Sequence, residues 1–136
     1  MAIPVTPTNV QKLEYNVTTP EGDARVTVVT GMLAYPLYTY SGGGIVTQNA
    51  SFRALVDPTT APGQFRKAVA TASLRQIGQT NGPTYAQWFI NEVQATLDDE
   101  TGSVQLVVDL SLSADGGGVY VYLNSIDFQV TTLAMI

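Results

Sequence analysis

The groups in this chain that could take part in catalysis are carboxylates, hydroxyls and tyrosines, because the sequence has no histidine and no cysteine. Its best-spaced acidic pair is Glu92 and Asp109, which lie on the two arms of a predicted hairpin at similar distances from its turn. Carboxylates that face each other can act as the acid and the base of a glycosidase. Antiparallel pairing of the arms alone would also place them opposite each other, on the solvent-facing side. We therefore expect no catalytic residue.

A second acidic group is the turn Asp98-Asp99-Glu100, with Asp115 on another loop. Calcium takes oxygen ligands from flexible loops, so these carboxylates could bind it. Their spacing does not match an EF-hand, and acidic residues in turns are typically solvated. We expect no metal and no cofactor.

Aromatic side chains are the remaining candidates for a binding site. Tyr38 and Tyr40 share one face of a predicted strand, and Tyr120 and Tyr122 share one face of another. If the two faces coincide, the rings form a platform that could stack on a sugar or lie in a subunit interface. Ordinary cross-strand aromatic pairing is the alternative. Trp88 either belongs to a strand buried on both sides or is an exposed interface anchor. The candidate binding residues are Tyr38, Tyr40, Trp88, Tyr120 and Tyr122.

The hairpin over residues 84–113 is the clearest structural element. On its second arm, apolar and mostly polar residues alternate with a period of two, which predicts a strand with one face on the core. The apolar row is Val104, Leu106, Val108, Leu110 and Leu112. On the first arm, the residues of one parity are Tyr85, Phe89, Val93, Ala95 and Leu97. An amphipathic helix is the alternative for this first arm, but its acidic end would oppose the helix dipole.

Short alternating segments separated by Gly, Pro and Asp turns fill the rest of the chain. They predict an all-β fold, an antiparallel β-sandwich or barrel of about 7–8 strands. We expect residues 1–9 to form an extended N-terminal arm and residues 10–136 a single β domain. A single helix around 64–77 is the alternative to a strand there. The apolar parity changes within residues 119–132, which predicts a β-bulge near Asn124-Ser125.

Composition limits the classes of function that fit. The chain has 136 residues and a net charge of −5, and only 12% of its residues are charged. The six cationic residues are scattered, which argues against nucleic-acid binding. No apolar run has transmembrane length and no secretory signal is recognisable, so we expect no membrane partner and a location in the cytoplasm or in a virion or other particle.

These observations predict a non-catalytic structural protein that self-associates. The expected partners are copies of the chain, as a homo-oligomer, or other protein subunits, for example in a virion, phage or other particle. The alternative is a β-sandwich that binds carbohydrate or another small ligand through its tyrosines.

Overall fold

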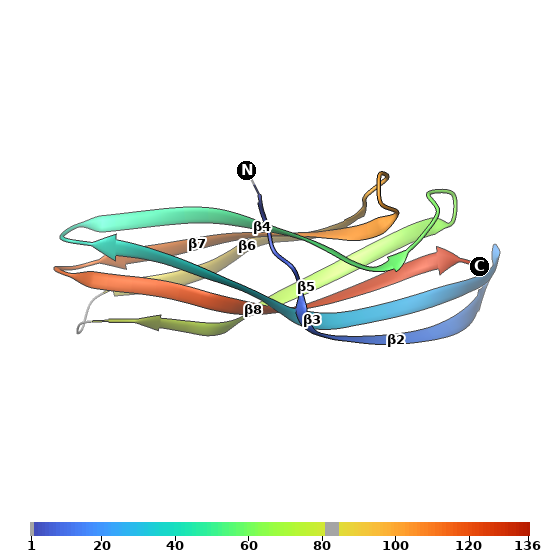
Figure 1. Cartoon of the computed structure of the whole chain (residues 1–136), viewed down its shortest axis with the longest axis horizontal. Coiled ribbons are helices and arrows are strands. Elements are labelled where there is room, and N and C mark those ends of the chain that lie inside the picture. Colours follow the sequence, from blue (N-terminus) through green and yellow to red (C-terminus); the bar gives the residue numbers. More distant parts are fainter. Residues whose placement is uncertain (1, 81–84) are drawn as a thin grey trace.

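The computed structural model describes residues 2–80 and 85–136 and consists of two four-stranded sheets packed face to face (Figure 1). Sheet A contains, in spatial order, β1 (Ile3–Pro4), β4 (Ile45–Thr59), β7 (Ser103–Asp115) and β6 (Tyr85–Leu97). Sheet B contains β2 (Thr8–Thr19), β3 (Gly22–Ser41), β8 (Val119–Met135) and β5 (Phe65–Gln79). Every neighbouring pair is antiparallel except β1 and β4. The predicted all-β antiparallel sandwich is confirmed.

The core lies between the two sheets and is built mainly by their central strands, β7 and β8. The predicted apolar row of β7 is fully buried, from Val104 to Leu112. It faces an inward row of β8 that includes Val121, Leu123 and Ile126. The predicted hairpin of β6 and β7 is also confirmed, with Leu97 paired to Val104 beside the turn.

Strand β6 changes face part-way along its length, and this corrects the expected single parity. The register with β7 slips between Ile90 and Glu92, which leaves Asn91 as an extra residue. A β-bulge of this kind reverses which side chains face the core. Val93 and Ala95 pack inward as expected, whereas Phe89 is exposed, as is Tyr85. The inward residues of the first half are Ala86, Trp88 and Ile90.

Strand β8 contains the second change of face, and the bulge predicted near Asn124-Ser125 is confirmed. Gln76 and Ile77 of β5 are consecutive but pair with Ser125 and Leu123, so Asn124 is an extra residue of β8. The register with β3 slips at the same level, between Ala34 and Leu37. Both Leu123 and Ile126 are consequently buried although their parity differs.

The helix alternative for residues 64–77 is wrong, because this segment is the strand β5. Ala68, Ala70, Ala72 and Leu74 alternate toward the core, and their backbone pairs with β8. Small inward residues let this edge strand lie close to β6 of the other sheet. The helical alternative for the first hairpin arm is wrong for the same reason, since β6 pairs with β7 over its whole length.

The N-terminal segment packs against β4 of the same chain. Ile3 and Pro4 pair with Phe52 and Arg53, and the Val5 amide donates to the Arg53 carbonyl at 2.9 Å. Ile3 and Val5 pack against the core before the chain crosses to sheet B. Burial of their apolar side chains favours this position of the segment on the sandwich.

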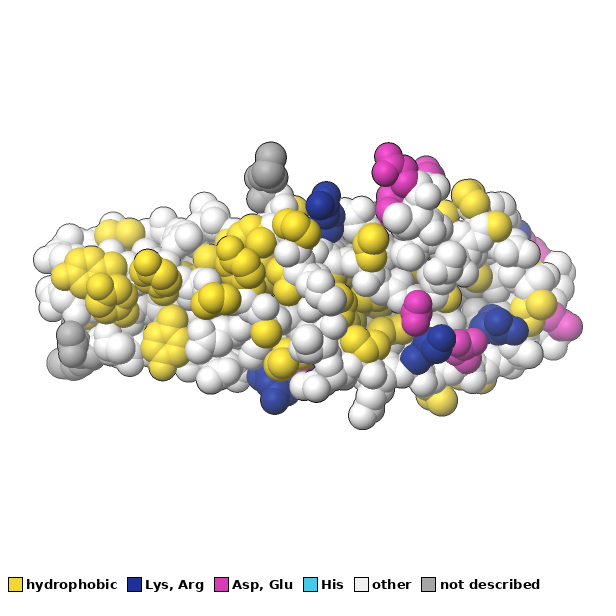
Figure 2. Space-filling model, viewed as in Figure 1, with side chains coloured by type: hydrophobic (Ala, Val, Ile, Leu, Met, Phe, Trp, Pro, Cys, Tyr) yellow, Lys and Arg dark blue, Asp and Glu magenta, His cyan; other side chains and the backbone are white. Residues whose placement is uncertain are grey.

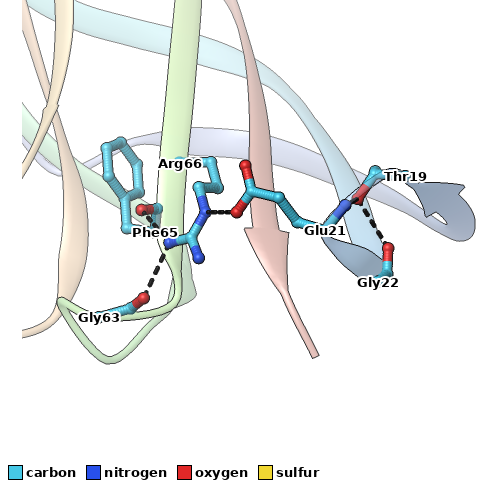
Figure 3. A network of polar contacts seen from close by, with 6 residues as sticks. All are labelled: Thr19, Glu21, Gly22, Gly63, Phe65 and Arg66. Atoms are coloured by element: carbon cyan, nitrogen blue, oxygen red, sulfur yellow. Dashed lines mark hydrogen bonds and ion pairs between the residues drawn. The ribbon is translucent and has the colours of Figure 1, made fainter.

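Polar contacts connect the strands at the end of sheet B that carries the β2–β3 turn (Figure 3). Arg66 of β5 forms an ion pair with Glu21 of the β2–β3 turn at 3.1 Å and donates to the Gly63 carbonyl at 2.8 Å. The Met135 amide donates to the Gln64 carbonyl, and the Ile136 amide to Asp23. The start of β5 and the end of β8 are therefore bonded to each other and to the residues around the β2–β3 turn.

Candidate functional site

The structure brings the four candidate tyrosines together on the outer face of sheet B. Tyr38 lies opposite Tyr122, and Tyr40 lies opposite Tyr120, on the adjacent strands β3 and β8. The Tyr40 and Tyr120 ring centroids are 4.7 Å apart, and those of Tyr38 and Tyr120 are 6.1 Å apart, with tilted planes. Tyr38 is the most exposed, at 62%. We call these four residues the tyrosine cluster.

The cluster is supported by Gly78 and Trp88. A Cβ added at Gly78 of β5 would overlap the Tyr122 phenol, so this glycine leaves room for the ring to lie across β5. Trp88 is directed into the sandwich and packs against the core, and its Nε1 donates to the Tyr122 carbonyl at 2.9 Å. Trp88 therefore does not join the tyrosines on the outer surface. It fixes the backbone of the strand that holds Tyr122.

The candidate carboxylate pair lies on the other side of the molecule, on the outer face of sheet A. Glu92 and Asp109 are opposite each other in the register, as predicted. Their neighbours are polar: Gln94 donates to Glu92, and a chain of hydrogen bonds links Asn91, Ser111 and Asn49 across three strands. This is an open, hydrogen-bonded sheet face, on which both carboxylates remain in contact with water.

The acidic turn and Asp115 do not form one site. The turn precedes the 13-residue strand β7, whereas Asp115, expected on a loop, is the last residue of this strand, whose ends are about 40 Å apart at an ordinary rise per residue. Asp98 instead accepts a hydrogen bond from Thr101 within its own turn, at 2.7 Å. Over residues 2–80 and 85–136, no three acidic side chains lie close enough together to hold a metal ion.

Sequence patterns did not predict an apolar patch on the outer face of sheet B, at the end away from the tyrosine cluster. Two neighbouring rows of paired residues cross the sheet there, and only Lys67 in them is charged. Leu13, Val69 and Tyr15 are 62%, 52% and 50% exposed. The first row is Tyr15, Val26, Leu133 and Lys67, and the second is Leu13, Val28, Thr131 and Val69. We call the apolar members Leu13, Tyr15, Val26, Val28, Val69 and Leu133 the apolar patch.

A signal for this patch was present in the sequence. In Val26-Thr27-Val28-Val29, side chains of both parities are apolar or β-branched, which indicates a strand with two apolar faces. The signal could not be used without the register, because the patch draws its side chains from four strands.

Between the patch and the tyrosine cluster, the same face is polar. A shallow hollow there is lined by side chains such as Thr30, Thr71, Arg75 and Asp127. Arg75 forms an ion pair with Asp127 at 3.3 Å. In the view of Figure 2, hydrophobic side chains and no charged ones are seen at the end where β3 runs into β4.

Charge on β2 is concentrated in Lys12 and Glu14, on the side opposite the apolar patch. Lys12 Nζ lies 2.9 Å from Glu14 Oε1 and 3.7 Å from Asp57 Oδ2. The hydrogen bond to Glu14 raises the pKa of Lys12, and the same bond lowers the pKa of Glu14. Both groups are ionised at neutral pH.

Comparison with known proteins gives no relative: no protein-family model, curated protein or solved structure matches this chain. In the part of the chain that the structure describes, no helix is long and apolar enough to cross a membrane.

Proposed function

We propose that this protein is a non-catalytic structural subunit that self-associates, and that the apolar patch is one of its contact surfaces. The observation behind the proposal is the exposure of Leu13, Tyr15 and Val69 on a sheet face that no other layer of the described residues covers. Contiguous exposed apolar surface of this kind is uncommon on monomers and typical of protein–protein contacts.

The geometry of the patch suits a second sheet. Its side chains stand in regular rows on four neighbouring strands, and stacked sheets pack about 10 Å apart through such rows. Burial of a valine or leucine side chain stabilises an interface by up to about 1.5–3 kcal/mol. Only Lys67, at the β5 margin, would have to remain hydrated at the rim.

The outer face of sheet A is the natural comparison. Thr47 and Ser113 hydrogen bond across β4 and β7 there, beside the Asn49–Ser111 bond. Asp109 and Glu92 add negative charge to this face. A polar and acidic face of this kind opposes stacking on its own copy.

Val69→Lys tests the role of the patch. Val69 is the β5 member of its row, so a lysine there replaces exposed apolar contact area by a second charge beside Lys67 and should weaken self-association about tenfold or more. Size-exclusion chromatography with light scattering over a concentration series measures the effect. Leu55→Lys is the matched control, because Leu55 is similarly exposed, at 44%, but lies on sheet A. Equal effects of the two variants would contradict the proposed surface.

A second candidate function is the binding of carbohydrate by the tyrosine cluster. It is favoured by the ring spacing of 4.7 and 6.1 Å, which leaves three exposed phenols side by side on an open face. Aromatic rings with polar tips stack on the apolar faces of sugars.

A glycan array tests this second function. Binding that is lost in a Tyr38→Ala/Tyr120→Ala double variant and kept in Tyr85→Ala, an exposed tyrosine on sheet A, would support it. An array without hits, or binding that survives the double variant, would remove it.

A further inference from the structure

Strand β2 is an unusual edge strand. It forms one end of sheet B and pairs only with β3 among the described strands. Ten of its 12 residues are exposed, on both faces, because sheet A does not extend over it. Its outer edge therefore presents a row of backbone donors and acceptors, the kind of edge that pairs with another strand.

We propose that a second copy of this chain pairs its β2 antiparallel to β2 of the first, about a two-fold axis that passes beside Leu13. Sheet B would then continue through eight strands across two subunits. The inference rests on the proposed self-association, but it uses a different surface from the face-to-face contact of the apolar patch.

Symmetry limits the registers that such a pair can adopt. Residues opposite each other in an antiparallel pair point to the same face, so the axis must pass beside a residue that meets its own copy. An axis at Lys12 would oppose two lysines, and an axis at Glu14 would oppose two glutamates. An axis at Leu13 places Lys12 opposite Glu14 of the second copy, twice.

Charge therefore selects the Leu13 register. Opposite charges directly across a strand pair are stabilising and like charges are destabilising. Lys12 and Glu14 already lie within 2.9 Å of each other in one chain, so pairing would create a group of four alternating charges. Within each chain, Asp57 also lies 3.7 Å from Lys12 and Arg25 lies 3.7 Å from Glu14, so both β2 charges have additional partners in their own chain.

The opposite face of the pair is also complementary. Leu13 meets its own copy there, and Gln11 meets Tyr15. Leu13 and Tyr15 belong to the apolar patch, so the patches of the two copies become one surface across the axis. At the start of β2, Asn9 has a φ of 53° and the register with β3 slips between Thr8 and Gln11, which limits regular pairing at that end.

Charge reversal tests the register. Lys12→Glu alone and Glu14→Lys alone each replace two attractions by two repulsions, so each should weaken edge pairing about tenfold or more. In an equimolar mixture of the two variants, every cross-strand pair is attractive again. Sedimentation velocity should therefore show a heterodimer in the mixture that neither variant forms alone. Changes in the stability of single chains cannot produce this result.

Cysteine cross-linking tests the position of the axis, because the natural sequence has no cysteine. In Leu13→Cys, the two Cα atoms would be about 4.5–5.5 Å apart, within the range of a disulfide. In Tyr15→Cys, an exposed control on the same face, they would be about 13 Å apart. Mild oxidation should give a covalent dimer with the first variant and not with the second.

The outcomes separate this inference from the proposed function. If the unmodified protein associates and Val69→Lys weakens it, but the mixture forms no heterodimer and the two cysteine variants cross-link equally, edge pairing is wrong and self-association stands. If the unmodified protein is monomeric at all concentrations, both are wrong.

Discussion

Phe52→Ala is expected to lower the free energy of unfolding by about 3–5 kcal/mol. The Phe52 side chain is fully buried on β4, between its pairing partners Ile3 and Val108. Its ring centroid lies 5.6 Å from that of Tyr35, which belongs to the other sheet. Alanine would leave a cavity at the point where β1, β4 and β3 meet. Urea unfolding, followed by the fluorescence of the single tryptophan, measures the loss.

Leu55→Ala is the control for this prediction. Leu55 lies three residues further along β4, but it points to the outer face of sheet A and is 44% exposed. Its truncation should change the free energy of unfolding by no more than about 0.5 kcal/mol. Similar losses for the two variants would show that the faces of β4 are assigned incorrectly.

Gly31→Ala is expected to destabilise the protein by about 1–3 kcal/mol, although it only adds a methyl group. A Cβ at position 31 would lie 2.8 Å from Phe128 Cζ and 3.2 Å from the Thr8 carbonyl oxygen. Phe128 is buried, so its ring has little room to move. The Thr8 oxygen belongs to the backbone at the start of β2 and cannot move as a side chain could. Thermal and urea unfolding both measure the effect.

Gly117→Ala provides the comparison, since a Cβ there meets nothing within 4 Å. We expect unfolding of this variant to match the unmodified protein within about 0.5 kcal/mol. A Gly31→Ala protein as stable as Gly117→Ala would mean that Phe128 does not pack over Gly31.

Much of the fold can be predicted from the sequence, because a strand with one face on the core alternates apolar and polar residues. The alternation in β7 extends without interruption from Val104 to Leu112, so its inner face could be predicted residue by residue. In β8 the parity change was visible because apolar residues lie on both sides of it. In β6 the bulge at Asn91 was not visible, because Tyr85 and Phe89 are as apolar as the residues that replace them in the core. For the same reason the sequence left open whether Trp88 is buried or exposed, and the structure packs it against the core.

The candidate surfaces depend on contacts between strands, which local patterns describe poorly. The tyrosine cluster could be predicted because each pair of tyrosines marks one face of its own strand, and only the pairing of β3 with β8 was missing. The apolar patch could not, because each strand supplies only one or two of its members. The acidic turn and Asp115 looked related in sequence, yet β7 holds them at opposite ends of the sandwich.

The two outer faces explain why self-association is the favoured function. The outer face of sheet A carries hydrogen-bonded hydroxyl and amide groups and carboxylates, with separate exposed side chains such as Phe89 and Leu55, whereas sheet B presents apolar rows at one end and tyrosines at the other. The free edge of β2 adjoins the apolar rows, so edge and face contacts could operate together. Two contacts of different symmetry would allow assemblies larger than a dimer.

Sedimentation equilibrium of the unmodified protein, from low to high micromolar concentration, tests self-association without any substitution. We expect the weight-average mass to rise with concentration above that of one chain, and to rise less for Val69→Lys. A mass equal to one chain throughout the series would show that this protein does not self-associate.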